Sequence, residues 1–317
     1  MMKKIIVIWW LNIDFLWLWT PKICWKWELS YWGKFEIKPG GKSRNIAQMI
    51  SNQMEKWEVV MIWKTSKDKY WLYNIPLDSL KESWVDISNI IIDESWNKDP
   101  WVALIPVDKD WNNQIYVLPW INDNFWEEDL ESKRDIFSEV WKNSWILVLS
   151  LELPIKTALY WIKLANEYWL KVILDPWGMI EWNDYKEILK EWIYFIKPNE
   201  QETKILTWIE IVDFESAKQA SKVFMNYWIK NILITVWKKW AYYFSNKSEK
   251  HYLIPDVIVD KSSKDETWCW DQTIATLSSQ IVNWKSINES IKESVLSGTL
   301  QFYKSWVCPL KKEDLLI

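Results

Sequence analysis

Short apolar runs alternate with amphipathic segments along most of this chain. The apolar runs have the length and β-branched content of buried strands, and they lie at residues 4–8, 59–62, 145–150, 171–175, 194–197 and 231–236. Segments with apolar positions at helical spacing lie between them, at residues 42–56, 154–168, 185–192 and 214–227. Because strands and helices alternate, the pattern predicts an α/β fold in which a parallel sheet carries helices on both faces.

Two segments interrupt this alternation. Residues 15–39 mix polar residues with β-branched and aromatic ones, and residues 98–120 contain two strand-like runs around a turn at 108–113. Both patterns are typical of short antiparallel excursions. We therefore expect a single domain over residues 1–317, with approximately residues 15–39 and 98–120 inserted in it.

The N-terminal segment allows two interpretations. Lys3 and Lys4 followed by an apolar run to Trp19 imitate a secretory signal, but Asn12 and Asp14 interrupt the run and no small-residue cleavage site follows. The alternative is a buried strand at residues 4–8 that runs into a tight turn and presents Asn12 and Asp14. No other stretch reaches the roughly 20 apolar residues that a membrane span needs.

The charge and cysteine content argue against several classes of protein. The chain has 39 basic and 43 acidic residues spread along its length, so neither a nucleic-acid-binding face nor a polybasic membrane patch stands out. Cys24, Cys269 and Cys308 are too few and too scattered for a disulfide framework or a zinc site. We expect a cytoplasmic protein without nucleic-acid or membrane partners.

Tryptophan and glycine occur in an abnormal ratio. The chain has 31 Trp and only 5 Gly, whereas ordinary proteins contain about 7% Gly. Trp stands where small turn residues belong, as at Trp111 between two strand-like runs, Trp208 after a helical segment and Trp169 before a strand-like run. Such places call for a positive φ, which glycine adopts freely and a bulky aromatic residue does not.

We therefore hypothesise that most Trp residues here are misread glycines. Together the two residue types make up roughly 11% of the chain, which is plausible for a glycine-rich α/β enzyme. Some bacterial genetic codes read UGA as glycine, and translating such a gene with a code that reads UGA as tryptophan would write this sequence. The alternative is a true Trp-rich protein, such as a carbohydrate-binding module with exposed rings, but the Trp residues are not spaced on any one face.

Two single carboxylates follow strand-like runs and could bind a ligand. Asp14, with Asn12 nearby, follows the first strand, where a carboxylate can accept two hydroxyl hydrogen bonds. Glu152 follows another strand, and open α/β sheets bind ligands at the carboxyl ends of their strands. Taken alone, either carboxylate is also consistent with a surface position at a strand end.

Three further segments place polar residues where a helix begins. Gly40 to Asn45 reads GGKSRN and could be an ordinary helix start; Asn199 to Glu202 lies in KPNEQE and could be an N-cap. Asp265 to Asp271 reads DETWCWD, which becomes DETGCGD with glycine at both Trp positions. The structural alternative for this last segment is a charged loop before a helix.

In this order, the segments resemble those of the ribokinase (PfkB) family of sugar kinases. Residues 40–45 resemble the family's GGKGANQA segment, residues 198–202 its PNxxE signature and residues 265–271 its DTTGAGD segment. Thr235, Trp237 and Trp240 look like its TxGxxG nucleotide-binding turn. Ser43 and Arg44 depart from the family's small residues. Gln272 and Thr273 depart from its usual Thr/Ser and Phe, and Glu266 stands in place of Thr.

The resemblance implies a role for each of these residues. Asp271 would be the catalytic base, and the backbone at Trp268, Cys269 and Trp270 would cradle the transferred phosphoryl group. Glu202 would act on Mg²⁺ through water, and Asp265 would hold a monovalent cation such as K⁺. The implied sugar-binding residues are Asn12, Asp14, Gly40, Gly41, Lys42, Asn45 and Glu152, and the implied nucleotide-binding residues are Asn199, Thr235, Trp237 and Trp240.

The resemblance also implies a fold and an activity. The fold would be a three-layer α/β/α sandwich with a small β-sheet lid, formed by the two inserted segments and able to mediate a homodimer. The activity would be transfer of the γ-phosphate of ATP, with Mg²⁺, to a primary hydroxyl of a small sugar, with ribose favoured. A fructokinase or nucleoside kinase stays open within the family, and a non-catalytic sugar-binding protein stays open if the Trp residues are real.

Overall fold

The structure is a computed structural model of the 317-residue chain. It describes residues 4–315 apart from residues 9, 111, 119–120, 122–124, 139–144, 237–239, 258–267 and 305–308. Among the described residues, no helix is long and apolar enough to cross a membrane.

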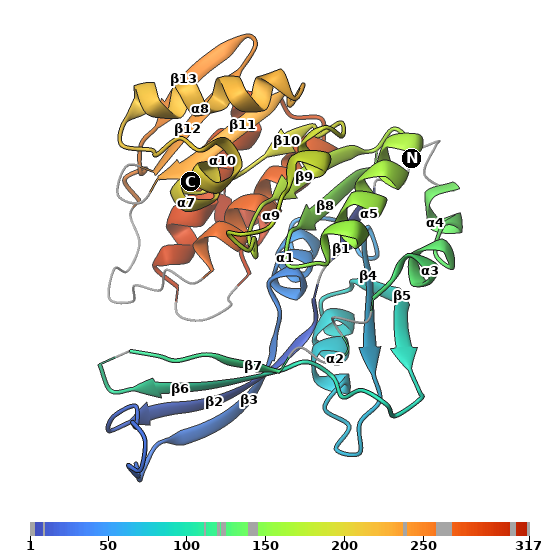
Figure 1. Cartoon of the computed structure of the whole chain (residues 1–317), viewed down its shortest axis with the longest axis vertical. Helices are drawn as coiled ribbons and strands as arrows, with labels where there is room; N and C mark the ends of the chain where they lie inside the picture. The colour runs from blue at the N-terminus through green and yellow to red at the C-terminus, as the bar shows by residue number, and fades with distance from the viewer. Residues whose placement is uncertain are drawn as a thin grey trace.

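A large sheet forms the centre of the molecule (Figure 1). Its described strands run in the order β13-β12-β11-β10-β9-β8-β1-β4-β5, and all neighbours pair in parallel except in the hairpin edge of β12 and β13. The buried, β-branched runs predicted as strands supply its middle, as expected for a parallel sheet covered on both faces. The strands are β1 (Ile5–Ile8), β4 (Val59–Ser66), β5 (Asp86–Asp93), β8 (Ile146–Ser150), β9 (Lys171–Asp175), β10 (Phe195–Ile196), β11 (Asn231–Val236), β12 (Trp240–Ser245) and β13 (Ser248–Tyr252).

Two groups of helices flank this sheet (Figure 1). One group packs α1 (Lys42–Ser51), α2 (Asn74–Glu82), α9 (Cys269–Val282) and α10 (Ile287–Phe302). The other contains α5 (Ile155–Glu167), α6 (Lys186–Leu189), α7 (Glu200–Thr207) and α8 (Phe214–Asn226), with the short α3 (Glu127–Glu131) and α4 (Asp135–Ser138) near α5. The predicted α/β architecture, a mostly parallel sheet flanked by helices, is therefore confirmed.

Two predicted helices are shorter than the sequence pattern suggested. The helix expected over residues 42–56 ends at Ser51, because the chain turns at Gln53 and Trp57 to enter β4. The helix expected over residues 185–192 has helical geometry only over Lys186–Leu189. In the first case Met54, beyond the end of the helix, still packs on the core, so its spacing extended the helical pattern.

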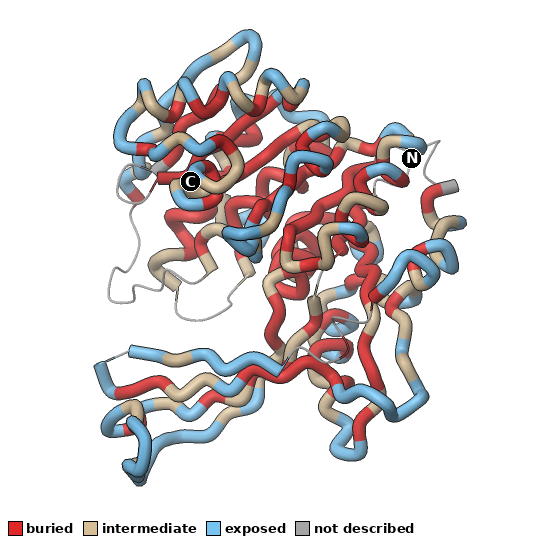
Figure 2. The backbone as a smooth tube through the Cα atoms, in the orientation of Figure 1, coloured by how far each residue is buried: buried red, intermediate tan, exposed pale blue. Residues whose placement is uncertain are grey.

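A second, four-stranded sheet projects from the main body (Figure 1). Its order is β3-β2-β6-β7, with β2 (Asn12–Thr20), β3 (Lys34–Gly40), β6 (Val102–Asp108) and β7 (Tyr116–Leu118). The two predicted excursions therefore join in one sheet, in which β2 pairs with β6 in parallel and the other pairs are antiparallel. We call this sheet the lid; Figure 2 shows that its strands are more exposed than those of the large sheet.

The backbone has an unusual feature at its tryptophans. Among the described residues, every non-glycine residue with positive φ is a Trp, and φ at these eleven positions lies between 59° and 75°. The expected positive φ is confirmed at Trp169 and Trp208, whereas Trp111 lies outside the described residues. The other positions are Trp19, Trp27, Trp32, Trp57, Trp71, Trp84, Trp96, Trp228 and Trp284.

Candidate active site

The chain enters α1 through two glycines that leave no room for side chains. A Cβ at Gly40 would lie 2.3 Å from the carboxyl oxygens of Asp14, the residue near it on the paired strand β2. Gly41 has φ of 95°, and a Cβ there would lie 2.4 Å from the carbonyl oxygen of Trp10. These glycines therefore let β3 and α1 approach β2 closely, so that Asn12 and Asp14 lie beside the start of α1.

Hydrogen bonds between buried amide and hydroxyl groups connect the end of α1 to α9. Gln53, just after α1, donates to the hydroxyl of Thr276 at 2.9 Å and accepts from that of Ser279 at 2.8 Å. Gln272, one of the departures from the family pattern, accepts from the backbone N–H of Leu310 at 3.2 Å. Because the polar groups of Gln53, Thr276 and Ser279 are buried and paired, they fix the relative position of α1 and α9.

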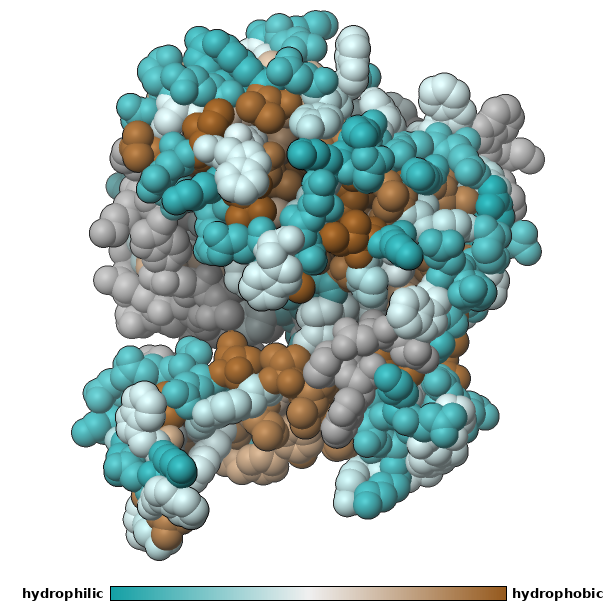
Figure 3. Space-filling view, viewed as in Figure 1, coloured by the Kyte–Doolittle hydropathy of each residue, from teal (hydrophilic) through white to brown (hydrophobic). Residues whose placement is uncertain are grey.

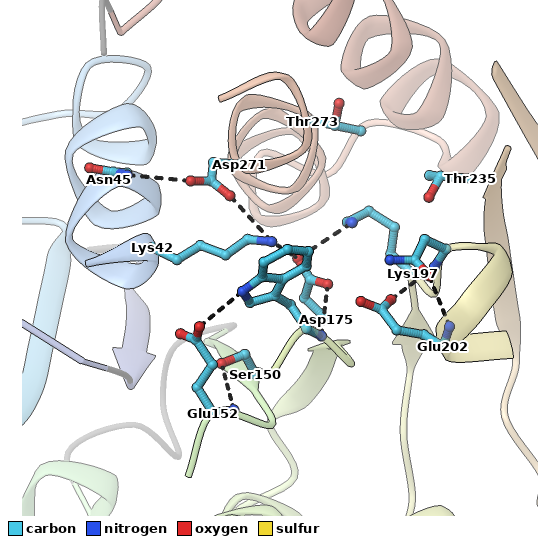
Figure 4. Close-up of polar contacts among 12 residues, drawn as sticks. Lys42, Asn45, Ser150, Glu152, Asp175, Lys197, Glu202, Thr235, Asp271 and Thr273 are labelled. Atoms are coloured by element: carbon cyan, nitrogen blue, oxygen red, sulfur yellow. Dashed lines mark hydrogen bonds and ion pairs between the residues drawn. The ribbon is translucent and has the colours of Figure 1, made fainter. Parts of the chain in front are cut away.

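The first turns of α1 and α9 meet at a buried ion-pair cluster (Figure 4). The Lys42 ammonium lies 3.4 Å from Oδ1 of Asp271 and 3.5 Å from Oδ2 of Asp175. Lys197, at the end of β10, lies 3.4 Å from the same Asp175 oxygen. Burial lowers the pKa of Lys42, but the carboxylates of Asp175 and Asp271 outweigh this effect, so its pKa lies above the usual value.

Asp271 is the buried carboxylate at the start of α9. Burial raises its pKa to about 6, a rise that Lys42 and the Asn45 side chain oppose and Asp175 reinforces. Asn45 Nδ2 donates to Asp271 Oδ2 over 3.4 Å. A carboxyl group with this pKa is mostly ionised at neutral pH and can accept a proton.

Asp14 and Asn12 line the same region from the lid strand β2. Burial raises the pKa of Asp14 to about 6, and the nearby Arg44 guanidinium opposes the rise. The Oδ1 atom of Asn12 is buried and has no hydrogen-bond partner within the described part of the chain. A buried acceptor of this kind is satisfied when a hydroxyl donor is bound beside it.

Glu152 follows β8 and reaches the cluster through an indole ring. Its Oε1 accepts from Trp177 Nε1 at 2.9 Å, and the Lys42 ammonium lies 4.3 Å from the centre of the Trp177 ring. The Glu152 charge also acts on Lys42, raising its pKa. Glu152 therefore lies on the same side of the sheet edge as Lys42 and Asp175 (Figure 4).

The predicted nucleotide residues Asn199 and Thr235 lie side by side. They form an isolated parallel bridge at the ends of β10 and β11, where Thr235 N donates to the Pro198 carbonyl at 2.9 Å. Asn199 caps α7: its Oδ1 accepts from Glu202 N, and Glu202 Oε2 accepts from Asn199 N, both at 2.8 Å. Burial raises the pKa of Glu202 to about 7, and Asp175 adds to the rise, so a nearby cation would favour the ionised form.

Part of the predicted phosphate site falls outside the described residues. Asp265 and Trp237 lie there, and the side chain of Trp240 is likewise not described. Trp268 precedes α9 as its N-cap, and Cys269 and Trp270 lie in its first turn. The Trp270 ring centre lies 5.7 Å from the Lys197 ammonium, so an indole occupies space directly beside the ion-pair cluster.

Asp175 and Lys197 were missed by the sequence analysis, although they lie at the centre of the cluster. Each is a single charge at the end of an apolar strand, the signal that identified Glu152. The carboxyl ends of β8, β9, β10 and β11 thus present Glu152, Asp175, Lys197 and Thr235 in spatial order along one sheet edge. Among the described residues, no group of three or more His, Cys, Asp or Glu could hold a metal ion.

Comparison with curated proteins finds relatives among ribokinases and deoxyribokinases. The chain is 26% identical over 283 residues to a bifunctional ribokinase/ribose-5-phosphate isomerase A of Fructilactobacillus sanfranciscensis, covering 88% of this chain and 49% of that protein. It is 26% identical to a ribokinase of Staphylococcus aureus (67% of this chain, 66% of that protein). It is 25% identical to a deoxyribokinase of Salmonella typhi (83% and 80%). The chain thus spans about half the length of the first relative and two thirds of the second.

Solved structures share the fold over nearly the whole chain. Ribokinase of Arabidopsis thaliana complexed with ribose and ATP superposes with a TM-score of 0.83 at 20% identity, covering 100% of this chain and 98% of that one. Ribokinase of Thermotoga maritima gives 0.79 at 20% identity, covering 99% and 98%. The family model described as pfkB family carbohydrate kinase matches residues 2–300. With its site residues gathered at the carboxyl edge of this fold, the chain belongs to the PfkB family of carbohydrate kinases.

Proposed function

We propose that this protein transfers the γ-phosphoryl group of ATP to a primary hydroxyl of a small sugar, with ribose as the preferred acceptor. The observation that carries the proposal is the buried pairing of Asp271 with Lys42 and Asn45, at the meeting point of α1 and α9. The contact of Asn45 with Asp271 brings together two separate motifs that lie 226 positions apart along the chain. An acceptor hydroxyl beside Asp271 would be within reach of both a base and hydrogen-bond donors.

Asp271 acts as the general base in this proposal. Its pKa of about 6 leaves the carboxylate ionised at neutral pH, so it takes the hydroxyl proton as the sugar oxygen attacks phosphorus. Lys42 balances the charge of Asp271 before the proton moves. Phosphoryl transfer depends mainly on positioning and charge stabilisation, and this cluster supplies both.

The phosphate side is formed by α9, β10 and α7. The N–H groups of the first turn of α9 point toward its N-terminus, where they favour an anion. Lys197 adds a positive charge, and Asn199 with Glu202 would hold the magnesium shell of ATP, since Mg²⁺ prefers oxygen ligands. When bound, Mg²⁺ neutralises charge on the phosphates, and we extend the proposal to a K⁺ ion at Asp265.

The sugar side is formed by Asn12, Asp14, Lys42, Asn45 and Glu152. The unsatisfied Oδ1 of Asn12 and the carboxylate of Asp14 are acceptors for sugar hydroxyls, and the ammonium of Lys42 is a donor. This set is ribokinase-like as a group, which favours ribose. Deoxyribose is a competing acceptor, because one relative is a deoxyribokinase. Fructose and nucleosides are the other competing acceptors.

The lid is the proposed interface of a cytoplasmic homodimer. Apolar side chains on its strands are exposed, among them Phe35, Leu104 and Val117. Figure 3 shows apolar surface gathered over the lid near its base. Sedimentation equilibrium tests this part: a dimer that Phe35→Lys dissociates supports it, and a monomeric parent protein contradicts it.

An ADP-release assay tests the activity. The chain as written and a variant with glycine at positions 268 and 270 are each offered MgATP with ribose, deoxyribose, fructose and nucleosides. We expect ribose-dependent ADP release by the glycine variant, because the two indoles lie at the phosphate end of α9. Turnover of another acceptor alone would replace ribose, whereas sugar binding without turnover by either form would favour a non-catalytic sugar-binding protein.

A further inference from the structure

Fifteen tryptophans stand at positions whose backbone or surroundings do not suit an indole side chain. Eleven have positive φ. Four others bury an indole N–H that has no hydrogen-bond partner within the described part of the chain, namely Trp10, Trp101, Trp145 and Trp161. We infer that the functional protein carries glycine at these fifteen positions.

The backbone argument is sharpest at helix ends. Trp84, Trp169, Trp228 and Trp284 each follow the C-cap of a helix with φ near 60°. In each case the next residue donates its N–H to the carbonyl five positions back, as Leu170 does to Ala165 at 2.9 Å. This is the Schellman arrangement, in which glycine is the usual residue because a Cβ is disfavoured in the left-handed conformation.

Positive φ occurs at too many Trp positions to be explained as backbone strain at isolated sites. Positive φ is uncommon for any residue with a Cβ, and Asn and Asp are the ones that normally tolerate it. This chain is rich in Asn and Asp, yet among the described residues every positive-φ position without glycine is a Trp. Function could strain one or two bulky residues, but not eleven spread over the lid, the loops and the helix ends.

The four buried indoles give an independent argument. A buried Trp usually finds a hydrogen-bond partner for its N–H, because leaving a buried donor unpaired is costly. Trp10 and Trp101 also bring their ring centres to 3.6 Å at an interplanar angle of 48°, closer than the usual separation of about 4.5–7 Å. Glycine at these positions removes both the unpaired donors and the crowding.

Peptide masses of the protein purified from its native cells test the inference directly. Peptides that contain positions 208, 228 and 284 should have the mass of glycine at each, and the gene should have TGA codons there. Glycine by mass supports the inference even if the codons differ. Tryptophan by mass at these positions overturns it.

Thermal unfolding of recombinant variants tests the physical basis. Trp208→Gly should raise the melting temperature by about 2–4 °C, because it relieves the left-handed strain at φ of 62°. The matched control is Trp182→Gly: Trp182 is 86% exposed, close to the 88% of Trp208, but does not have positive φ. Its melting temperature should stay or fall. Equal effects of the two substitutions would overturn the backbone argument.

A separate observation concerns Arg44, a buried cation beside the proposed site. Its side chain is 2% exposed, and its guanidinium donates to Gln48 Oε1 at 2.7 Å, to Ser79 Oγ at 3.1 Å and to Asn45 Oδ1. These three hydrogen-bond partners are neutral, and burial lowers the pKa of Arg44 to about 10, although the carboxylates of Asp14 and Asp271 oppose the shift. Burying a guanidinium is costly when these hydrogen bonds go to neutral groups and not to a carboxylate, which points to a role for Arg44.

The hydrogen bonds of Asn45 define that role. Guanidinium groups only donate, so the carboxamide must present its oxygen to Arg44. Its Nδ2 then faces the carboxylate of Asp271, which only accepts when ionised. Resting on the proposed function, we propose that Arg44 is a positioning residue that holds the Asn45 amide with its N–H toward Asp271.

The charges that face Asp271 come from several elements. Lys42 and Arg44 lie on α1, Asp175 on β9 and Lys197 at the end of β10. Arg44→Gln would remove one cation and, because glutamine both donates and accepts, would let the Asn45 amide turn. Both changes raise the pKa of Asp271. Arg44→Lys keeps a donor-only cation and should largely preserve the orientation.

Infrared titration of the Asp271 carboxyl group tests this proposal without depending on activity. The Asp271 band is identified as the one that Asp271→Asn removes. Arg44→Gln should move its midpoint to higher pH, and Arg44→Lys should keep it near that of the parent protein. The control Ser79→Ala removes one guanidinium hydrogen bond but keeps the contact with Asn45, so it should leave the midpoint in place. An unmoved midpoint in Arg44→Gln overturns the positioning role, whereas failure of the proposed function would instead be seen as absence of turnover by the parent protein.

Discussion

The ammonium group of Lys42 lies 3.4 Å from a carboxyl oxygen of Asp271, although 229 positions separate the two residues in the chain. The contact depends on α1 packing against α9, which Gln53 fastens through Thr276 and Ser279. It also depends on Gly41, whose positive φ turns the chain into α1. A residue from the opposite end of the sequence thus opposes the rise in the pKa of the proposed base that burial causes.

The acid limb of the pH profile of kcat/KM should have its midpoint near pH 6. Burial raises the pKa of Asp271 to about 6, so a fall in pH through this value protonates the base and activity is lost. Above the midpoint the carboxylate is ionised and activity is retained. An active enzyme with a flat profile from pH 5 to 8 would contradict this assignment.

Replacing Lys42 by methionine should destabilise the protein by about 3 kcal/mol, because it leaves the buried carboxylates of Asp271 and Asp175 with one cation fewer. Urea unfolding measures the loss. The double variant Lys42→Met with Asp271→Asn should recover part of it, since one of the unpaired charges is then absent. Strict additivity of the two substitutions would show that the pair does not interact.

Asp175→Asn should also lower stability by about 3 kcal/mol, because Lys42 and Lys197 both lose their shared carboxylate. Burial pushes the pKa of Asp175 up, but the two lysines hold it below its usual value, so the charge is present at neutral pH. Asp184→Asn, at an exposed position, serves as the control. Equal stability of the two variants would rule out the central role given to Asp175.

Asp14→Asn should weaken sugar binding by roughly 10-fold or more, because it replaces a charged acceptor with a neutral one. The effect should fall on KM more than on kcat, since Asp14 lies on the lid strand β2 and not beside the base. Isothermal titration with the sugar measures affinity, and the exposed Asp78→Asn provides the comparison. Unchanged affinity would remove Asp14 from the sugar site.

Much of the fold and part of the site could be predicted from the sequence. Local apolar periodicity located most central strands and helices, and separate short motifs identified Lys42, Asn45 and Asp271. Asp175 and Lys197 were not identified because a single charge at a strand end has no local context that distinguishes a buried ion pair from a solvated one. The burial of Arg44 depends on the packing of α1 against α2, which local pattern does not encode.

The lid illustrates a second limit. Its two segments were recognised as strand pairs, but the parallel pairing of β2 with β6 joins residues about 90 positions apart, and no turn signal specifies such a register. The backbone conformation at the tryptophans, by contrast, could be predicted from local sequence. Positive φ was predicted from sequence alone for Trp208, because it follows a helical segment, and for Trp169, because it precedes a strand-like run, and both predictions are confirmed.

The most direct test of the proposed mechanism is the turnover of Asp271→Asn, measured as ADP release at saturating ribose and MgATP in the background with glycine at positions 268 and 270. We expect kcat to fall by about 10²-fold or more, because the substitution removes the general base, while ribose affinity stays nearly unchanged. Full turnover by Asp271→Asn would contradict the assignment of Asp271 as the catalytic base.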